Sequence, residues 1–521
     1  MTRYIHVRPL LWAFAIYSLL FTLELTLSLR QTGAQLVYPL DDTYISMSIA
    51  KNVALHGVWG VTPFEFTSAS STPFYIMLIA AAYWVTGVAP WWPAALAFAF
   101  GALAIVAAYA ALPGGVARRT WGALAVIILT PLAPLAHTGM EHTLHIFLSI
   151  LFVSRASRDI SEKRPMDFGL LLLAPVLVLT RFEGLFLIGF TVVLLAYRRV
   201  FLLSATLLAS ATVPVLVYAV ISMSHGWSLL PNSVLLKGNL LTADPLVSFF
   251  RVVFHAINLF RRAPHLIGVV ASLLFVMFAL RKQCLWNPAR VLLLLTLAAV
   301  AAHLAFADVG WVYRYEAYLI ALSAVSLIWS LPLMADRRSQ IAVYGMLALA
   351  GGSLLLRSAR IFGEMPSICE AVYSQQYQMA RFVGRYFQHK SIAANDIGAI
   401  NYMTDIRLFD LTGLADAEVL ERKSQRTYTT QALLEESRRK GTDIAIVYDA
   451  WFSNSPVSLF GGPPLPSAWV RVGRWRCDVK GQLGGDTVSF YAVHPQEAAD
   501  LAGKLKVFAP SLPPHVIAVE N

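Results

Sequence analysis

The sequence predicts a polytopic α-helical membrane protein of about 11 transmembrane helices, followed by a C-terminal α/β domain outside the cytoplasm. Three observations support this fold class. The 521-residue chain is 57% hydrophobic and only 14% charged, whereas a soluble protein carries about 25% charged residues. Its mean hydropathy is +0.61. After residue 357 the long apolar runs stop, and charged residues return at ordinary density.

Eleven apolar runs approach the ~17–25 residues that a helix needs to cross a bilayer. They fall near residues 9–29, 94–112, 120–137, 141–154, 166–180, 184–197, 200–222, 265–280, 290–307, 315–334 and 340–356. The first run is too long for the apolar part of a signal peptide and lacks a small-residue cleavage pattern after it. We therefore interpret it as an uncleaved first transmembrane helix.

The positions of Lys and Arg indicate how the chain is threaded. These residues collect at 3–8, 118–119, 155–164, 198–199, 281–290 and 337–338. If the further apolar segment 73–87 lies in the membrane interface, eleven spans place every cluster in the cytoplasm, as the positive-inside rule requires. The net charge of +11 is thus explained by topology and does not indicate nucleic-acid binding. We expect a multi-pass protein of the inner (plasma) membrane.

Residues 1–356 then form the membrane domain, with a first outer loop over 30–93, and residues 357–521 form the outer domain. In the outer domain, helical patterns over 370–390 and 428–440 alternate with short apolar segments typical of strands. These segments are 391–394, 407–411, 443–448 and 487–493. Cys369 and Cys477 both lie in this domain, and the sequence is compatible with a disulfide or with two free thiols.

Two adjacent acids, Asp41 and Asp42, lie in the first outer loop. An ionisable residue at a membrane is costly and indicates a functional site. Neighbouring residues on a helix point in different directions, so the two acids should have different roles. Residues 43–55 have a helical pattern, and Asp is a favourable N-cap. We therefore assign a general-base role to Asp41 and a capping role to Asp42; the alternative is that both are caps or surface acids.

The same topology places several other polar turns on the outer face. Nearly all acids and histidines outside the cytoplasmic loops lie there, in residues 137–142, 181–184, 223–264 and 308–314. The membrane domain is therefore polar at one boundary, which suits a site at the outer leaflet.

Short motifs in these turns resemble those of the GT-C membrane glycosyltransferases and are most similar to the bacterial arabinofuranosyltransferase-like branch. In chain order they are Asp41-Asp42-Thr-Tyr-Ile, Ala50 to Gly57, Thr67 to Pro73, Gly139-Met140-Glu141-His142-Thr143, Thr180 to Gly184, Leu230-Pro231-Asn232-Ser233 with Lys237, Arg314-Tyr315, and Asp410 to Asp416. Each is short, but their order and shared sidedness make the set fairly specific. The resemblance ends near residue 420.

This resemblance implies an inverting glycosyltransferase that takes a sugar, with arabinofuranose as one candidate, from a polyprenyl-phosphate donor. The acceptor would be a glycan or lipid of the cell envelope at the outer face of the membrane. The catalytic acid would come from the first outer loop, at Asp41 or Asp42. The residues implied in substrate binding are Glu141, His142, Arg181, Glu183, Lys237, Arg314 and Tyr315.

Chemical reasoning supports these residue types. An acceptor hydroxyl is a weak nucleophile, and a positioned carboxylate accepts its proton as the new bond forms. The departing lipid phosphate gains charge, which cations stabilise; Arg181, Lys237 and Arg314 are the candidates. Each has a structural alternative. In the structural alternative for Arg181, its pairing with Glu183 would only end a helix. In the alternative for Lys237 and Arg314, the long side chains would extend to lipid headgroups.

The sequence lacks two spacings that are typical of metal sites. The chain has no CxxC or DxD spacing, so we assign no metal ligand and do not favour a divalent cation as cofactor.

The alternative function is a transporter or flippase of a lipid-linked sugar. Such proteins often carry internal repeats and interrupted helices, and this sequence shows no repeat, so the enzyme is favoured.

Overall fold

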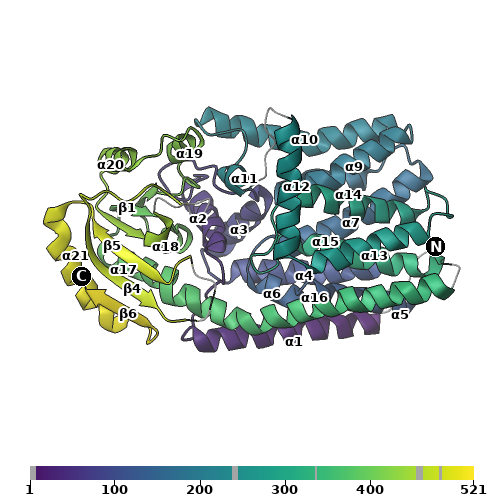
Figure 1. Cartoon of the computed structure of the whole chain (residues 1–521), viewed down its shortest axis with the longest axis horizontal. Coiled ribbons are helices and arrows are strands. Elements are labelled where there is room, and N and C mark those ends of the chain that lie inside the picture. The colour runs from purple at the N-terminus through teal and green to yellow at the C-terminus, as the bar shows by residue number, and fades with distance from the viewer. Residues whose placement is uncertain are drawn as a thin grey trace.

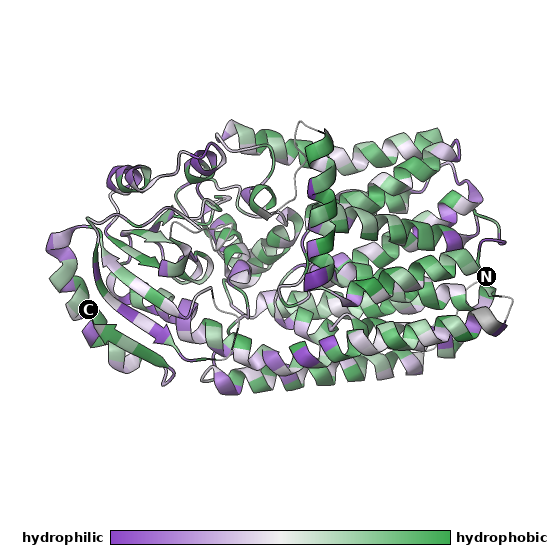
Figure 2. Ribbon diagram, viewed as in Figure 1, coloured by the Kyte–Doolittle hydropathy of each residue, from purple (hydrophilic) through white to green (hydrophobic). Residues whose placement is uncertain are grey.

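The chain folds into a long helical bundle with a sheet domain at one end, in a computed structural model that describes residues 7–237, 245–334, 337–452, 461–479, 481 and 484–520. Figure 1 shows the N-terminal end at the far tip of the bundle and the C-terminal end in the sheet domain. Figure 2 shows that apolar residues dominate the bundle, whereas hydrophilic residues concentrate in the sheet domain and in the loops at the opposite tip. This distribution is the one expected of a membrane-embedded bundle.

The bundle consists of helices that run roughly along the long axis of the molecule (Figure 1). They are α1 (Val7–Gln31), α4 (Trp92–Ala111), α5 (Val116–Leu129), α6 (Leu132–His137), α7 (His142–Glu162), α8 (Phe168–Thr180), α9 (Gly184–Tyr197), α10 (Phe201–Ser224), α13 (His265–Ala279), α14 (Pro288–Phe306), α15 (Ala317–Ser330) with the 3₁₀ turn η1 (Leu331–Leu333), and α16 (Arg337–Val372).

Five helices of the described residues are long and apolar enough to cross a membrane, or six if one strongly bent pair counts as a single span. The bent pair is α12 (Pro245–Arg262) with α13, which meet at 110°. Four shorter apolar segments of 10–17 residues accompany them, namely Pro73–Thr86, Phe168–Thr180, Gly184–Tyr197 and Ala317–Leu333. The existence of a polytopic bundle is thus supported, and the count of eleven spans stays a prediction.

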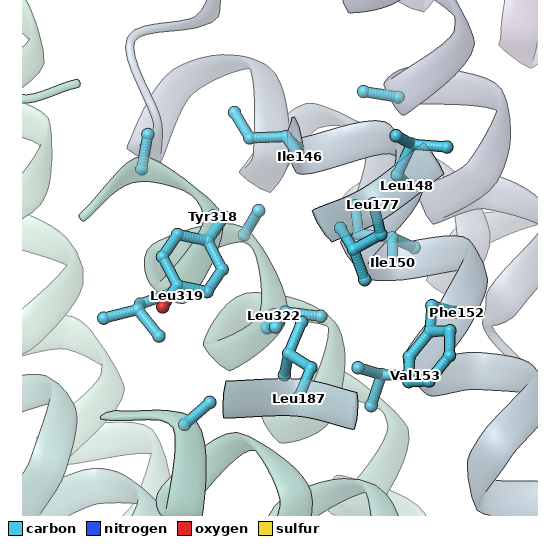
Figure 3. Packing of buried hydrophobic residues seen from close by; sticks show 14 of the residues in the cluster. Ile146, Leu148, Ile150, Phe152, Val153, Leu177, Leu187, Tyr318, Leu319 and Leu322 are labelled. Atoms are coloured by element: carbon cyan, nitrogen blue, oxygen red, sulfur yellow. The ribbon is translucent and has the colours of Figure 1, made fainter. Parts of the chain in front are cut away.

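The core of the bundle is a continuous apolar cluster centred on α7. Figure 3 shows Ile146, Leu148, Ile150, Phe152 and Val153 of this helix facing Leu177 of α8, Leu187 of α9 and Tyr318, Leu319 and Leu322 of α15. All of these side chains are at most 3% exposed. Burial of this kind stabilises by about 1.5–3 kcal/mol for each large apolar side chain in water. It fixes α7, whose first turn begins at the candidate site.

Short helices fill the junction between the bundle and the sheet domain. They are α2 (Asp41–His56), α3 (Pro73–Thr86) and α11 (Asn232–Lys237), with α12 standing across the bundle axis beside them (Figure 1). Helix α3 buries Tyr75, Ile76 and Ile79 and exposes Trp84 on its other side. The interfacial position predicted for this segment stays a prediction. Helix α12 was not expected, since residues 223–264 were interpreted as a loop.

The C-terminal domain is reached through one nearly continuous helix. Helix α16 runs through residue 357 and continues by a π-helical turn (Tyr373–Tyr377) into α17 (Gln378–Tyr386). The other elements are β1 (Ser391–Ala394), α18 (Gly398–Met403), β2 (Arg407–Asp410), α19 (Ala417–Ser424), α20 (Thr430–Arg439), β3 (Ile444–Val447), η3 (Asp449–Trp451), β4 (Val470–Cys477), β5 (Thr487–Ala492), η4 (Pro495–Glu497), α21 (Ala498–Phe508), η5 (Ala509–Ser511) and β6 (Val516–Glu520).

The six strands of the described residues form a single mixed sheet in the order β2-β1-β3-β5-β4-β6. Strands β1, β2 and β3 are parallel, and the pairs β3–β5, β4–β5 and β4–β6 are antiparallel. One face packs against α17 and α21 through an apolar cluster that includes Phe382, Phe490 and Phe508. The other face packs against α19 and α20 around Phe409 and Leu433. The predicted α/β domain is therefore confirmed.

One sequence-based expectation needs correction here, and one open alternative is resolved. Helix α2 begins two residues earlier than the capping argument required, so its N-cap is Leu40, and no side chain caps it. The expectation that Asp42 caps this helix was therefore wrong. Cys369 and Cys477 are both free and buried. Cys369 lies on α16, where its sulfur faces His137, whereas Cys477 ends β4 against the π-helical turn. Of the two arrangements that the sequence left open, two free thiols is therefore the one found.

Candidate active site

A cavity of about 700 Å³ lies at the junction of the bundle and the C-terminal domain. One part of its wall is apolar and comes from α9, α10, α11 and α14, with side chains such as Phe186, Val215, Val234 and Phe306. The polar part gathers side chains from five separate chain segments: Asp42, Ser46, Ser70, Ser71, Thr72, Glu141, Arg181, Glu183, Asp308, Arg314 and Tyr315. The polar turns that the sequence placed on one face thus converge on one cavity.

The two adjacent acids of α2 point to different parts of the protein. Asp42 lines the cavity, whereas Asp41 is not among the lining residues. The carboxylate of Asp41 instead accepts hydrogen bonds from the backbone N–H groups of Gly398 (2.5 Å) and Ala399 (2.8 Å). These residues begin α18, so Asp41 caps a helix of the C-terminal domain. The acid that faces the cavity is therefore Asp42 and not Asp41, to which the sequence analysis assigned the base role.

Asp41 is held in an unusual electrostatic environment. Burial, and then the neighbouring carboxylate of Asp396, raise the pKa of Asp41 well above its ordinary value, and the two backbone N–H groups offset this only in part. Asp396 is itself hydrogen-bonded by Gln376 (2.8 Å) and by the hydroxyl of Tyr448 (2.8 Å). A carboxyl in this position suits a contact between domains, and it does not line the cavity.

Asp42 is paired with Arg314 across the cavity wall. A carboxylate oxygen of Asp42 accepts a hydrogen bond from the Arg314 guanidinium. The Asp42 side chain is 30% exposed, but Arg314 is only 2% exposed. The guanidinium also donates to the Tyr315 hydroxyl (2.8 Å) and contacts the sulfur of Met140 (2.8 Å). Asp42 is thus the accessible member of an ion pair whose cation is fixed.

Arg181 forms the second cationic group of the site. Its guanidinium donates to Glu141 (2.5 Å) and to Glu183 (2.5 and 3.2 Å). Burial raises the pKa of Glu183, but the charge and hydrogen bonds of Arg181 lower it more, to about 2. The ring of Tyr315 lies between the two guanidinium groups, 5.3 Å from that of Arg181 and 4.8 Å from that of Arg314. Such contacts orient both cations towards the cavity.

The remaining predicted residues are placed less directly. His142 is buried beside Glu141 (3.5 Å) and does not line the cavity. Lys237 ends α11, one turn after Ser233 and Val234, which line the cavity; its side chain lies outside the described residues. Of the seven predicted substrate-binding residues, Glu141, Arg181, Glu183, Arg314 and Tyr315 meet around the cavity.

Several residues of the cavity wall were not among the predicted site residues. Ser70 and Ser71 lie in the first outer loop, within the segment Thr67 to Pro73, and they carry hydroxyls that can bind sugar or phosphate oxygens. Leu414 reaches the cavity from the C-terminal domain. Its loop is held by Asp410, which accepts from the backbone N–H groups of Thr412 (2.8 Å) and Ala415 (2.6 Å). Asp410 therefore acts within the turn, and neither Asp410 nor Asp416 lines the cavity.

Among the described residues, no group of three or more His, Cys, Asp or Glu side chains has the arrangement of a metal site. At the polar end of the cavity, acids outnumber arginines, because Asp42, Glu141, Glu183 and Asp308 surround Arg181 and Arg314. Asp308 is itself paired with Arg262 (2.6 Å), which leaves three acids and two arginines at the cavity.

The overall fold resembles that of ArnT from Cupriavidus metallidurans, as two solved structures show. In the crystal structure bound to undecaprenyl phosphate, the match has 13% sequence identity, a TM-score of 0.56, and covers 94% of this chain and 99% of that one. The apo structure matches with 12% identity and a TM-score of 0.52, over 84% of this chain and 93% of that one. This likeness supports the predicted kind of fold, whereas membership of the GT-C superfamily and of its arabinofuranosyltransferase-like branch stays a prediction.

Residues 368–491 match a family described as a domain of unknown function (DUF8728). No curated protein matches the sequence.

Proposed function

We propose that this protein is an inverting glycosyltransferase that transfers a sugar from a polyprenyl-phosphate donor to a glycan or lipid acceptor of the cell envelope, at the outer face of the membrane. The observation that carries the proposal is the pairing of Asp42 with Arg314 in a cavity that is polar at one end and apolar at the other. ArnT, whose fold the chain shares, was crystallised bound to undecaprenyl phosphate.

The apolar wall supports a lipid carrier as donor. The side chains of Phe186, Val215 and Phe306 belong to helices of the bundle, so isoprene units would pass from the bilayer into this part of the cavity. The donor phosphate would then reach the polar end, where Arg314 is fixed and Asp42 is accessible. Lys237 stays a proposed phosphate ligand on the strength of its position in α11.

The reaction would proceed as a single displacement. Asp42 accepts the proton of the acceptor hydroxyl, the hydroxyl oxygen forms a bond to the anomeric carbon, and the bond from that carbon to the phosphate oxygen breaks on the opposite face. The phosphate leaves on its lipid with one additional negative charge. Arg314, with Arg181 across the ring of Tyr315, stabilises that charge.

The ion pair observed between Asp42 and Arg314 has a direct consequence for this scheme. A carboxylate bound to a guanidinium is a weaker base, because its charge is already compensated. A donor phosphate that takes the place of Asp42 on Arg314 would free the carboxylate. Asp42 is the more exposed partner, so Asp42 is the group that would move.

The test is a transfer assay in membranes with radiolabelled polyprenyl-phosphate sugars, polyprenyl-phosphate arabinofuranose first, and an envelope acceptor extract. Asp42→Asn should reduce turnover by roughly 10²–10⁴-fold, the usual contribution of a general base. Asp500→Asn is the matched control, because this acid lies at the surface of the C-terminal domain and is 67% exposed. Asp41→Asn is measured beside it, since that carboxylate holds α18 and does not line the cavity. Full turnover by Asp42→Asn would remove the carboxylate from the chemistry. Movement of a lipid-linked sugar across proteoliposomes without transfer would favour the flippase alternative.

A further inference from the structure

The segment before Arg314 has a backbone conformation that L-residues rarely adopt. Four consecutive residues have positive φ values: Gly310 (92°), Trp311 (47°), Val312 (67°) and Tyr313 (57°). Only the first is a glycine. A left-handed conformation places Cβ too close to the following carbonyl oxygen and is usually confined to single residues. Three successive non-glycine residues in this region therefore need strong support from their surroundings.

That support comes from a buried carboxylate, Glu316, which closes the turn. One of its oxygens accepts from the backbone N–H of Gly310 (3.0 Å), and the other accepts from the Arg357 guanidinium (3.2 Å). The His265 ring lies 3.5 Å from the same carboxylate. Glu316 is 0% exposed and the Arg357 side chain 4% exposed. The turn is thus tied to the long helix α16 by a charged pair inside the protein.

Arg357 also contacts the turn directly, through the ring of Tyr313. Its guanidinium lies 4.7 Å from the ring centre of Tyr313 and donates to the backbone oxygen of Leu129 (3.0 Å). Val312 is 3% exposed and packs in an apolar cluster with Met140 and Met365. The turn is therefore held through its backbone by Glu316, through the ring of Tyr313 by Arg357, and through the side chain of Val312 by an apolar cluster.

The turn is followed at once by Arg314, the cation that binds Asp42. Its backbone N–H donates to the carbonyl of Gly310 (3.2 Å), so the turn determines where the Arg314 side chain begins. Neither Glu316 nor Arg357 lines the cavity. Their contact with the site runs through the backbone of the turn.

We propose that Glu316 and Arg357 are positioning residues that hold the left-handed turn Gly310–Tyr313 and thereby fix the Arg314 guanidinium for the lipid phosphate and for Asp42. The expected effect on sugar transfer rests on the proposed function. The support that Glu316 and Arg357 give to the turn does not depend on that function. The strain of the turn is retained because it places a rigid cation where the negative charge of the leaving group develops.

The first test uses Glu316→Gln and Arg357→Lys, with Glu364→Gln as the matched control on the same helix. Glu364 is 48% exposed and pairs with Arg360. Hydrogen exchange of the peptide covering residues 307–316 should become faster in both positioning variants and stay unchanged in the control. In the transfer assay, misplacement of the cation should lower kcat by roughly ten- to a hundredfold, with a smaller effect on KM for the donor.

A second variant separates loss of positioning from general unfolding. Trp311 is 50% exposed, and a glycine there adopts positive φ without strain. Trp311→Gly added to Glu316→Gln should therefore slow hydrogen exchange in 307–316 again and raise kcat towards that of the wild type. Unchanged exchange in Glu316→Gln, or no recovery in the double variant, would overturn the proposal. If the wild type transfers no sugar, the proposed function fails, while the exchange measurements still decide whether Glu316 and Arg357 hold the turn.

Discussion

The substitution Gly398→Ala tests the contact that joins the C-terminal domain to the first outer loop. Gly398 is the first residue of α18, where its N–H binds the carboxylate of Asp41. A Cβ at this position would lie 2.2 Å from the backbone oxygen of Asp41 and 2.7 Å from its carboxyl carbon. The nearest atom is backbone, so the two helices must separate by about 1 Å to restore van der Waals contact.

The expected loss follows from three contributions. Forced separation of packed elements costs about 1–3 kcal/mol, and weakening the two hydrogen bonds to Asp41 costs about 1–3 kcal/mol. Ala in place of Gly in a helix returns about 1 kcal/mol, since the φ of Gly398 is not positive. The net destabilisation of the docked domain should be about 1–5 kcal/mol, with a midpoint of about 3 kcal/mol. The Tm of the C-terminal domain should fall by about 5 °C or more.

The assay is thermal unfolding in nanodiscs, together with limited proteolysis of the outer domain. Gly503→Ala is the control, because this residue lies inside α21 and no heavy atom is within 4 Å of the added Cβ. That variant should unfold at the wild-type temperature or slightly above it. If Gly398→Ala matches Gly503→Ala in both measurements, the close approach of α2 and α18 does not exist in solution, and our account of Asp41 is refuted.

Three further predictions concern individual ionisable groups. Burial and the carboxylate of Asp396 raise the pKa of Asp41, so the docked state binds a proton more tightly than the undocked state. Docking should be strongest at low pH and weaken as pH rises through the raised pKa of Asp41. In an assay of domain release by protease, Asp396→Asn should shift this weakening of docking to lower pH. A pH profile identical to that of the wild type would contradict the prediction. Glu141→Gln should destabilise the fold by about 3–5 kcal/mol, as expected when a fully buried ion pair is broken. Glu183→Gln should destabilise it less, because the Glu183 side chain is 16% exposed. Equal losses of unfolding free energy for the two variants in denaturant would be inconsistent with this difference. Burial raises the pKa of the Cys477 thiol to about 12, so a maleimide at pH 7.5 should label it only after unfolding, and rapid labelling of the folded protein would show that the thiol is accessible.

Much of the fold could be predicted because it depends on local patterns. The strands β1, β2, β3 and β5 are short apolar runs, and they were expected within a residue or two of their observed positions. Strand β4 was missed, because charged residues such as Arg471, Arg474 and Arg476 interrupt its apolar positions. Strand β6 was missed as well, since its place depends on pairing with β4.

The candidate site could be predicted as a set of segments but not as a geometry. The polar turns carrying Glu141, Arg181 and Arg314 were expected on one face, and they meet around one cavity. Which acid of the doublet faces that cavity depends on α18, more than 350 residues further along the chain. No periodicity near Asp41 carries this information. The left-handed turn before Arg314 was equally unpredictable, since Trp, Val and Tyr do not favour positive φ.

Asp41 and Asp42 are neighbours in the chain, so a single peptide bond connects the contact with the C-terminal domain to the cavity. Asp41 is bound to the first turn of α18, and Asp42 reaches the cavity. Consecutive Cα atoms are held about 3.8 Å apart, so a shift of the outer domain is transmitted to the proposed base within one residue. An acceptor that binds the outer domain would therefore adjust the base even without touching the cavity. Removing the domain at residue 357 would alter the reactivity of the membrane domain left behind, and a truncated chain is not a neutral reference for this protein.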